Sequence, residues 1–439
     1  MNLLGIDVGS SSVKAAVLRK GNPHGPIVRA FFKTEHRGER VEVPAERILK
    51  ALGEAVKQLG APAKRVDAVG LTVMSPAWCA MDARGRALTP VVTHQDRRSV
   101  AEAVEIERRV GLERHMRLAG NRPFPGSIGS TTWAWYQRYE PGRLAKVDLV
   151  GLLNTYLHRQ LTGSRVIDPS NASFTGWYAT LEQSGWSEDL CDATSVAPAL
   201  LPAVLEADRV AGRITKGAAA KFGLTEGTPA MVGMIDTSAA MLLGPERPGQ
   251  LLDVVGSTDV LALCTDRPRP HERLLTRALG VNGKRWMSVS TIAAAGSSLL
   301  WAREQLFREM SIDAFRSLVL RVSRTSKSDE SPGVTFDPYL AGERASVEQR
   351  KAAFGGLTLA TTREQMLGAI VASLARASAD RLKLFESGGV KIRREVVVSG
   401  GAADRLDRVF QRDWPGKWTF RRYTEASLRG LGKLLPRER

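Results

Sequence analysis

The chain has 439 residues, of which 43% are hydrophobic and 25% are charged, so it can bury a large core and favours more than one domain. Lysine and arginine together number 63 against 46 aspartates and glutamates, which gives a formal net charge of +17. Because these basic residues are scattered and lack interleaved aromatic residues, the charge argues against a nucleic-acid-binding protein.

Targeting and membrane signals are missing from the sequence. The apolar runs are short and interrupted by arginine, aspartate or glycine, so no membrane-spanning segment is expected. The N-terminus lacks a basic start, and Asp7 interrupts its first apolar run. The three cysteines lie far apart without metal-ligand or disulfide spacing, which favours buried thiols. We therefore expect a cytoplasmic enzyme with no membrane or nucleic-acid partner.

The first half of the chain alternates strand and helix signals. Residues 3–17 form two apolar runs around a small polar turn, the pattern of a hairpin. A second apolar run at 69–73 predicts a strand that ends before Pro76, and helical patterns begin at about Val100. This alternation predicts an α/β fold.

The second half begins with a similar pattern. Residues 227–236 predict a strand, and 238–243 predict a small-residue helix that closes at Gly244. Residues 251–261 then repeat two apolar runs around a Gly-Ser-Thr tip. This internal resemblance predicts a duplicated fold with domains at 1–244 and 245–439.

The remaining signals lie toward the C-terminus. Residues 323–333 are polar and end in Pro-Gly, which predicts an exposed loop. Residues 362–385 place apolar side chains on one face and predict a long core helix. Residues 395–398 predict a buried strand that leads into a glycine turn.

Three glycine turns carry candidate phosphate-binding residues. Glycine followed by hydroxyl residues exposes backbone N–H groups and small donors, which suit an anionic phosphate chain. A carboxylate beside such a turn suits Mg²⁺. Each turn by itself is more often structural than functional. The candidates are Asp7, Gly9, Ser10, Ser11, Ser12 and Lys14 in the first turn, Gly256, Ser257 and Thr258 in the second, and Gly400 and Gly401 in the third.

Together these segments resemble a known family. Residues 7–14, 234–240 and 256–258 are similar to the first phosphate loop, catalytic segment and second phosphate loop of the FGGY carbohydrate kinases, within the sugar kinase, actin and Hsp70 ATPase superfamily. Residues 338–344 and 354–359 resemble segments specific to that family, which disfavours an actin-like or chaperone ATPase. The motifs occur in the family's order over nearly the whole chain.

This resemblance implies two actin-like, ribonuclease H-like domains around a nucleotide cleft, with ATP and Mg²⁺ as cofactors. It implies that Asp236 is the general base that accepts the proton of the acceptor hydroxyl, and that Asp7 is the carboxylate associated with the metal. An Asp after a strand is also a favoured helix N-cap, so the residue alone leaves capping open. The family context favours catalysis.

The residues that would select the acceptor depart from the family pattern. Ser75 and Pro76 stand where xylulose kinases carry a Gln-Met-His-Gly run and glycerol kinases carry Arg-Glu. His94 replaces a tryptophan, and Asp96 is retained. Asp96 beside two arginines is either a solvated ion pair or a sugar contact, and His94 is either structural or a ligand contact. The glycine turn at 400 and the segment after it are shorter than is usual in the family.

We therefore expect an ATP-dependent kinase that phosphorylates a hydroxyl of a sugar or polyol, with a ketose such as xylulose as the leading candidate. The alternative is a kinase-like protein that binds carbohydrate or nucleotide without turnover, since Ser75 and Pro76 differ from the family. The sequence leaves a homodimer open.

Overall fold

The computed structural model describes residues 1–325, 333–343, 346–348, 350–400 and 407–438, and it confirms the predicted α/β class. These residues form two compact units. Unit 1 comprises Met1–Glu246, Cys264–Ser288 and Ala426–Arg439, and unit 2 comprises Arg247–Leu263 and Val289–Glu425. The units therefore interleave along the chain, and the division at 244/245 stays a prediction about its domains.

Unit 1 contains most of the secondary structure. Its strands are β1 (Asn2–Val8), β2 (Ser12–Arg19), β3 (Asn22–Pro23), β4 (Val28–Phe31), β5 (Glu35–Arg37), β6 (Arg40–Val43), β7 (Ala68–Val73), β8 (Ala77–Met81), β9 (Val91–Thr93), β10 (Leu149–Leu152), β11 (Val166–Ile167), β12 (Ala203–Val204), β13 (Val210–Arg213), β14 (Pro229–Met231), β15 (Met234–Ile235) and β18 (Leu275–Ala278). Its helices are α1 (Ala45–Leu59), α2 (Val100–Val110), α3 (Leu112–Ala119), α4 (Gly129–Tyr139), α5 (Pro141–Leu144), α6 (Leu153–Leu161), α7 (Pro169–Ala172), α8 (Glu188–Asp192), α9 (Lys216–Phe222), α10 (Asp236–Met241) and α15 (Ala426–Leu431).

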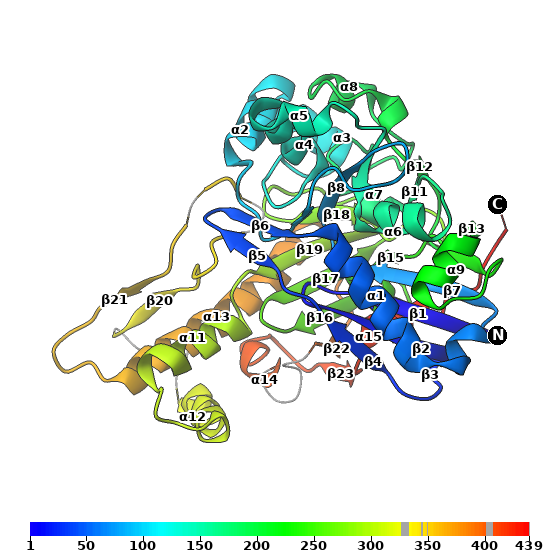
Figure 1. Cartoon of the computed structure of the whole chain (residues 1–439). Coiled ribbons are helices and arrows are strands. Elements are labelled where there is room, and N and C mark those ends of the chain that lie inside the picture. The colour runs from blue at the N-terminus through cyan, green and yellow to red at the C-terminus, as the bar shows by residue number, and fades with distance from the viewer. Residues whose placement is uncertain (326–332, 344–345, 349, 401–406, 439) are drawn as a thin grey trace. The chain divides into compact units, whose positions relative to one another are not determined.

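The main sheet of unit 1 is built on the predicted hairpin. Strands β1 and β2 pair antiparallel, with Asp7 opposite Lys14, and β7 pairs parallel with β1 on the other side. The sheet order is β13-β14-β7-β1-β2-β3, with β15 also on β7 and β4 also on β2. Helix α1 packs against β2 and β4 (Figure 1). Since β1 and β7 are buried almost throughout, their residues are apolar on both faces, apart from Asn2, Asp7 and Thr72.

A second sheet of unit 1 has the order β10-β8-β9-β6-β5. Strands β8 and β9 pair antiparallel, with Ala77 opposite Thr93. Because β8 starts two residues after Ser75, this pairing brings the end of β9 close to the chain segment that follows β7.

Unit 2 repeats the hairpin arrangement. Its elements are β16 (Leu251–Val255), β20 (Thr335–Asp337), β21 (Ala353–Gly355), β22 (Glu395–Ser399), β23 (Thr419–Arg422), α11 (Gly296–Leu306), α12 (Ile312–Thr325), α13 (Arg363–Ser387) and α14 (Asp407–Phe410), whereas β17 (Asp259–Thr265) and β19 (Trp286–Ile292) are each divided between the units. Strands β16 and β17 form an antiparallel hairpin, and β22 pairs parallel with β16. This arrangement matches β1, β2 and β7, and it supports the predicted duplication.

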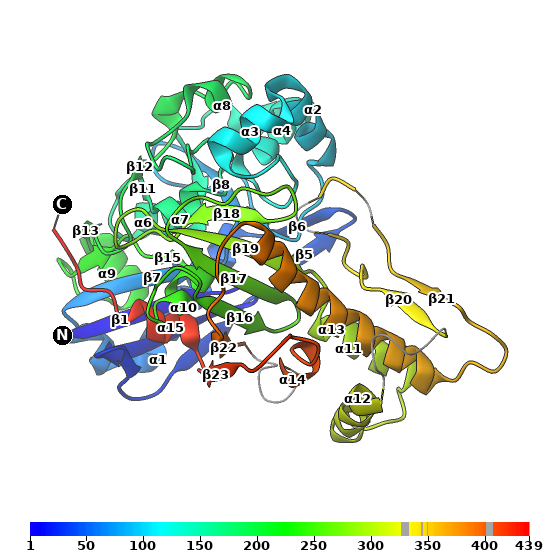
Figure 2. The ribbon, with the colours of Figure 1, turned by 180° about the vertical axis from the view of Figure 1, so that it is seen from behind.

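Helix α13 forms as predicted. Thr362 caps it, and Gln365 completes a capping box in which each side chain bonds the other residue's backbone N–H. The helix packs against α12 and β20 (Figure 2). The loop predicted at 323–333 is wrong in its first part, because 323–325 continue helix α12, and 326–332 lie outside the described residues. Within the described ranges, no helix has the length and apolar character needed to cross a bilayer.

Candidate active site

Three neighbouring parallel strands of unit 1 end at the same edge. In the sheet, β7 lies between β1 and β15, and Val73 aligns with both Val8 and Ile235. The residues that follow these strands are therefore adjacent at the carboxyl edge, the position where α/β sheets commonly bind ligands. The predicted first phosphate loop follows β1, Ser75 and Pro76 follow β7, and Asp236 follows β15. Residues far apart in the sequence thus meet at one edge.

The first loop is a tight turn with exposed hydroxyls. The N–H of Gly9 donates to the carbonyl of Ser12 at 3.0 Å, so that amide is used inside the turn. Ser10 and Ser11 are exposed at its tip, whereas Ser12 is buried. The loop therefore offers hydroxyls and the remaining turn amides to an anion.

Asp7 lies next to this loop and is held in place by side chains from two directions. The hydroxyl of Ser427 donates to Oδ2 of Asp7 at 2.8 Å, and Nζ of Lys14 lies 3.8 Å from the same oxygen. Asp7 is only 5% exposed. A buried carboxylate held this way has a defined orientation at the mouth of the loop.

The residues present suit magnesium bound together with a nucleotide. Among the described residues, no group of three or more His, Cys, Asp or Glu side chains could hold a metal by itself. Mg²⁺ commonly retains several waters and takes one or two carboxylates plus substrate phosphates, so it does not need such a cluster. Asp7, next to the predicted phosphate-binding turn, fits this mode of magnesium binding.

Asp236 is the first residue of α10. The N-cap position is Ile235 and no side chain forms a cap hydrogen bond, so Asp236 is not the N-cap residue. Its Oδ1 accepts the N–H of Thr237 at 2.6 Å. The side chain is half-buried, so the carboxylate is in an ordered position and is partly open to solvent.

Helix α10 is held by close packing against α15 (Figure 2). A Cβ added at Gly430 would lie 1.7 Å from the carbonyl oxygen of Ala239, so only glycine permits this approach. The position of α10, and with it that of Asp236, therefore depends on Gly430.

Replacing Gly430 with Ala should force the two helices apart and destabilise the protein by about 3 kcal/mol. Thermal unfolding followed by circular dichroism measures this loss. Gly217→Ala in α9 is the matched control, because a Cβ there meets nothing within 4 Å, and its stability should be unchanged or slightly higher. Equal stability of Gly430→Ala and wild type would show that α10 and α15 are not tightly packed.

The candidate acceptor residues lie around the end of β7. A cis peptide joins Ser75 to Pro76, and Oγ of Ser75 is buried without a hydrogen-bond partner. His94 directly follows β9, whose Thr93 pairs with Ala77, so His94 lies near Pro76. These three residues are together, as a shared acceptor site requires.

Asp96 differs from the expectation of a solvated ion pair. It is 1% exposed, and its Oδ2 accepts the N–H of Val41 and Nη2 of Arg98, each at 2.7 Å. Its Oδ1 accepts the backbone N–H and Nε of Arg98, each at 3.0 Å. Nη2 of Arg98 also lies 2.5 Å from Glu42. Since both oxygens of Asp96 already have partners, its contacts are those of a structural residue.

The predicted second phosphate loop, residues 256–258, forms the tip of the β16–β17 hairpin in unit 2. The N–H of Gly256 donates to the carbonyl of Thr258 at 2.8 Å, and the carbonyls of Gly256 and Ser257 accept N–H groups from the start of α11. The loop carbonyls thus anchor it, and the side chain of Ser257 is left exposed.

Buried polar contacts fix the strands of this hairpin. Asp253 accepts Nε2 of Gln411 at 2.6 Å, and Asp259 accepts Nη2 of Arg381 at 2.6 Å. Burial, together with the nearby Asp259, raises the pKa of Asp253 well above its usual value. These contacts tie the loop's two strands to α13 and to Gln411.

The third glycine turn meets the second loop at the edge of the unit 2 sheet. Gly400 follows β22 with a φ of 104°, and a Cβ there would lie 2.1 Å from the carbonyl oxygen of Val255. Glycine is required at this position. Gly401 and Arg344, which belong to the predicted motifs, lie outside the described residues.

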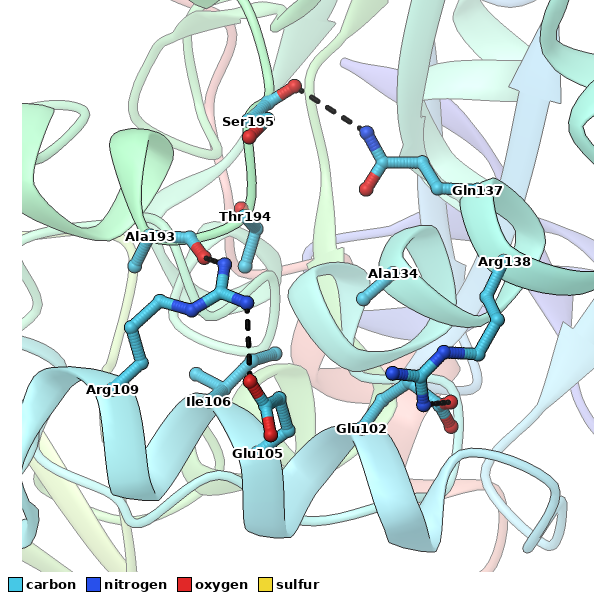
Figure 3. Close-up of a pocket in the computed structure, with 10 residues that line it drawn as sticks. All are labelled: Glu102, Glu105, Ile106, Arg109, Ala134, Gln137, Arg138, Ala193, Thr194 and Ser195. Atoms are coloured by element: carbon cyan, nitrogen blue, oxygen red, sulfur yellow. Dashed lines mark hydrogen bonds and ion pairs between the residues drawn. The ribbon is translucent and has the colours of Figure 1, made fainter.

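A cavity of about 300 Å³ in unit 1 contains none of the predicted site residues (Figure 3). Its walls come from α2, α4 and residues 193–195. Its guanidinium groups are already paired: Arg109 bonds Glu105 and the carbonyl of Ala193, and Arg138 bonds Glu102. This pocket is therefore a weaker candidate for the acceptor than the strand edge.

Sequence reasoning missed three residues that contact the site. Ser427 bonds Asp7, Ser170 bonds the N–H of Ile235, and Arg277 bonds Thr237. Arg277 is a charged residue within the short buried strand β18, and this is the sequence signal that could have identified it as a candidate site residue. Ser427 and Ser170 carry no such signal.

Comparison with known proteins agrees with this arrangement. Residues 2–243 match the N-terminal domain of the FGGY family of carbohydrate kinases, and residues 252–411 match its C-terminal domain. A xylulose kinase of Escherichia coli strain K12 is 26% identical over 433 residues, covering 94% of this chain and 85% of that protein. A glycerol kinase of Trichlorobacter lovleyi is 28% identical over 435 residues, covering 94% and 85%.

The fold is also shared with solved structures. The crystal structure of xylulose kinase from Rhodospirillum rubrum aligns with a TM-score of 0.87 at 23% identity, covering 99% of this chain and 89% of that one. Both family domains match in order and together span most of the chain. The chain therefore belongs to the FGGY family of carbohydrate kinases and is an ATP-dependent sugar kinase.

Proposed function

We propose that this kinase transfers the γ-phosphate of ATP to a hydroxyl of a ketose or polyol, with xylulose the leading candidate, and that Asp236 is the general base. The observation that carries the proposal is the shared edge of β1, β7 and β15, which places Asp7, Ser75 and Asp236 at neighbouring strand ends. Xylulose kinases among the similar proteins support the choice of sugar.

Asp236 has the chemistry that the reaction requires. An alcohol is a poor nucleophile at neutral pH, so a carboxylate must accept its proton as the bond to phosphorus forms. Asp236 is ordered by its bond to the N–H of Thr237 and stays partly exposed, so a hydroxyl can approach it. Catalysis otherwise rests on positioning and charge stabilisation.

The phosphate chain would be held by the loop residues. Ser10 and Ser11 present hydroxyls, and Lys14 contributes a positive charge beside Asp7. Mg²⁺, when bound with the nucleotide at Asp7, supplies a further charge that neutralises the β- and γ-phosphates.

The acceptor would contact Ser75 and His94. Oγ of Ser75 is buried without a partner, and a buried hydroxyl in that condition is one that a ligand hydroxyl can satisfy. Because serine is short, it reads a sugar hydroxyl less selectively than a histidine or arginine would. We therefore propose that the enzyme accepts more than one ketose or polyol.

The test is ADP release by purified protein with Mg-ATP and a panel of ketoses, polyols, aldoses and aldonates. The expected result is release that depends on a ketose or polyol, with the phosphorylated product identified by mass spectrometry. Release that is independent of any sugar, or ATP binding without turnover on any member of the panel, would contradict the proposal.

A further inference from the structure

A buried arginine lies beside the proposed catalytic base. Arg277 belongs to β18 and is 1% exposed. Its Nη2 donates to Oγ1 of Thr237 at 2.6 Å and contacts the sulfur of Met287 at 3.6 Å. Its Nε and Nη1 are buried without hydrogen-bond partners. Thr237 is the residue immediately after Asp236, so this guanidinium contacts the first turn of α10.

Burying a guanidinium in this way carries an unfavourable desolvation free energy. Burial lowers the pKa of Arg277 to about 10, and the negative charges of Asp236 and Asp168 oppose that shift. The acceptor of its short bond is a neutral hydroxyl, which compensates poorly for the lost hydration of a cation. A buried charge with incomplete pairing is typical of a functional site.

The residue before Asp236 is held from the other side. The N–H of Ile235 donates to Oγ of Ser170 at 3.2 Å, and the Ser170 hydroxyl in turn donates to Oδ2 of Asp168. Asp168 is fully buried, caps α7, and accepts Nδ2 of Asn154 at 2.9 Å. The backbone around Asp236 is thus fixed on one side by Ser170 and on the other by Arg277.

We propose that Arg277 is a positioning residue for Asp236: through its bond to Thr237 it fixes the first turn of α10, and its buried positive charge attracts the Asp236 carboxylate and so restricts the orientations of that side chain. This inference rests on the proposed role of Asp236. Arginine suits the task better than lysine, because its planar guanidinium can bond Thr237 with one nitrogen while its charge is spread over all three nitrogens.

The first test compares Arg277→Met with Arg277→Lys. Methionine keeps similar length without charge or donors, so kcat should fall about 100-fold, the scale of a misplaced catalytic group, while KM for ATP stays within about threefold. Lysine restores the charge and one donor, so Arg277→Lys should recover at least about tenfold in kcat over Arg277→Met. Arg138→Met, which removes an exposed guanidinium from Glu102 in the same unit, is the control and should keep wild-type kcat.

The second test is a double-mutant cycle with Thr237→Val, a small change that keeps the fold measurable if Arg277→Met unfolds. Thr237→Val alone should lower kcat, and Arg277→Lys combined with Thr237→Val should lose less than the product of the two single effects. Strictly multiplicative losses, or a kcat for Arg277→Met within threefold of wild type, would overturn the inference. Retained turnover in Asp236→Asn would be a different result: it would contradict the proposed role of Asp236 as general base, and with it the role of Arg277.

Discussion

Replacing Asp236 with Asn should lower kcat for sugar phosphorylation by about 1,000-fold, the scale of a lost general base. Asparagine keeps the size and hydrogen-bonding reach of the side chain but cannot accept the proton of an alcohol. The bond from the N–H of Thr237 can persist to the amide oxygen, so the start of α10 should stay in place. A coupled assay of ADP release with the best acceptor measures the loss.

The informative comparison is between turnover and nucleotide binding. The dissociation constant for ATP, from calorimetry, should change by less than about threefold, which is under about 0.7 kcal/mol. Asp82→Asn is the control and should keep the wild-type kcat. Asp82 is a buried carboxylate of the same unit, and it accepts the backbone N–H groups of Arg84 and Arg86 within its own turn. Turnover of Asp236→Asn near the wild-type rate would remove Asp236 from the mechanism.

Replacing Asp7 with Asn should raise the Mg²⁺ concentration needed for half-maximal activity by more than about tenfold, and removing Mg²⁺ with a chelator should stop turnover of the wild type. The neutral amide is a weaker ligand for a hard dication than a carboxylate. Activity is measured while MgCl₂ is titrated at fixed ATP.

Ser427→Ala separates direct from supporting roles at this site. The hydroxyl of Ser427 bonds Oδ2 of Asp7 from outside the loop. Its loss leaves the carboxylate present but less well oriented, so the Mg²⁺ concentration needed for half-maximal activity should rise by about tenfold. An unchanged Mg²⁺ dependence in Asp7→Asn would assign the metal to other groups.

The elements that could be predicted were those with strong local patterns. The hairpin of β1 and β2, its counterpart β16 and β17, and the long helix α13 all follow from apolar periodicity together with turn or capping residues. The prediction of a loop at 323–333 was wrong for its first residues, because polar residues can extend an amphipathic helix. Ser323 is 9% exposed, at the end of α12.

Asp96 shows why side-chain environments were harder to predict. Its neighbouring arginines left a solvated ion pair and a sugar contact both open, since short-range sequence does not reveal what packs above a residue. In the structure, Val41 and Arg98 satisfy both carboxylate oxygens in the interior. A contact between residues 41 and 96 depends on the pairing of the second sheet, which no local pattern encodes.

The sequence by itself determined the local parts of the candidate site: a strand, a glycine turn and the carboxylate of Asp7 are formed by neighbouring residues, whereas the choice of Asp236 rested on the resemblance to the FGGY family. The tertiary structure decided which distant groups hold those carboxylates. Ser427 reaches Asp7 across 420 residues of chain, and Arg277 reaches Thr237 across 40. Such contacts arise only when parallel strands and packed helices bring remote segments to one edge, because hydrogen bonds depend on distance in space and not on separation along the chain.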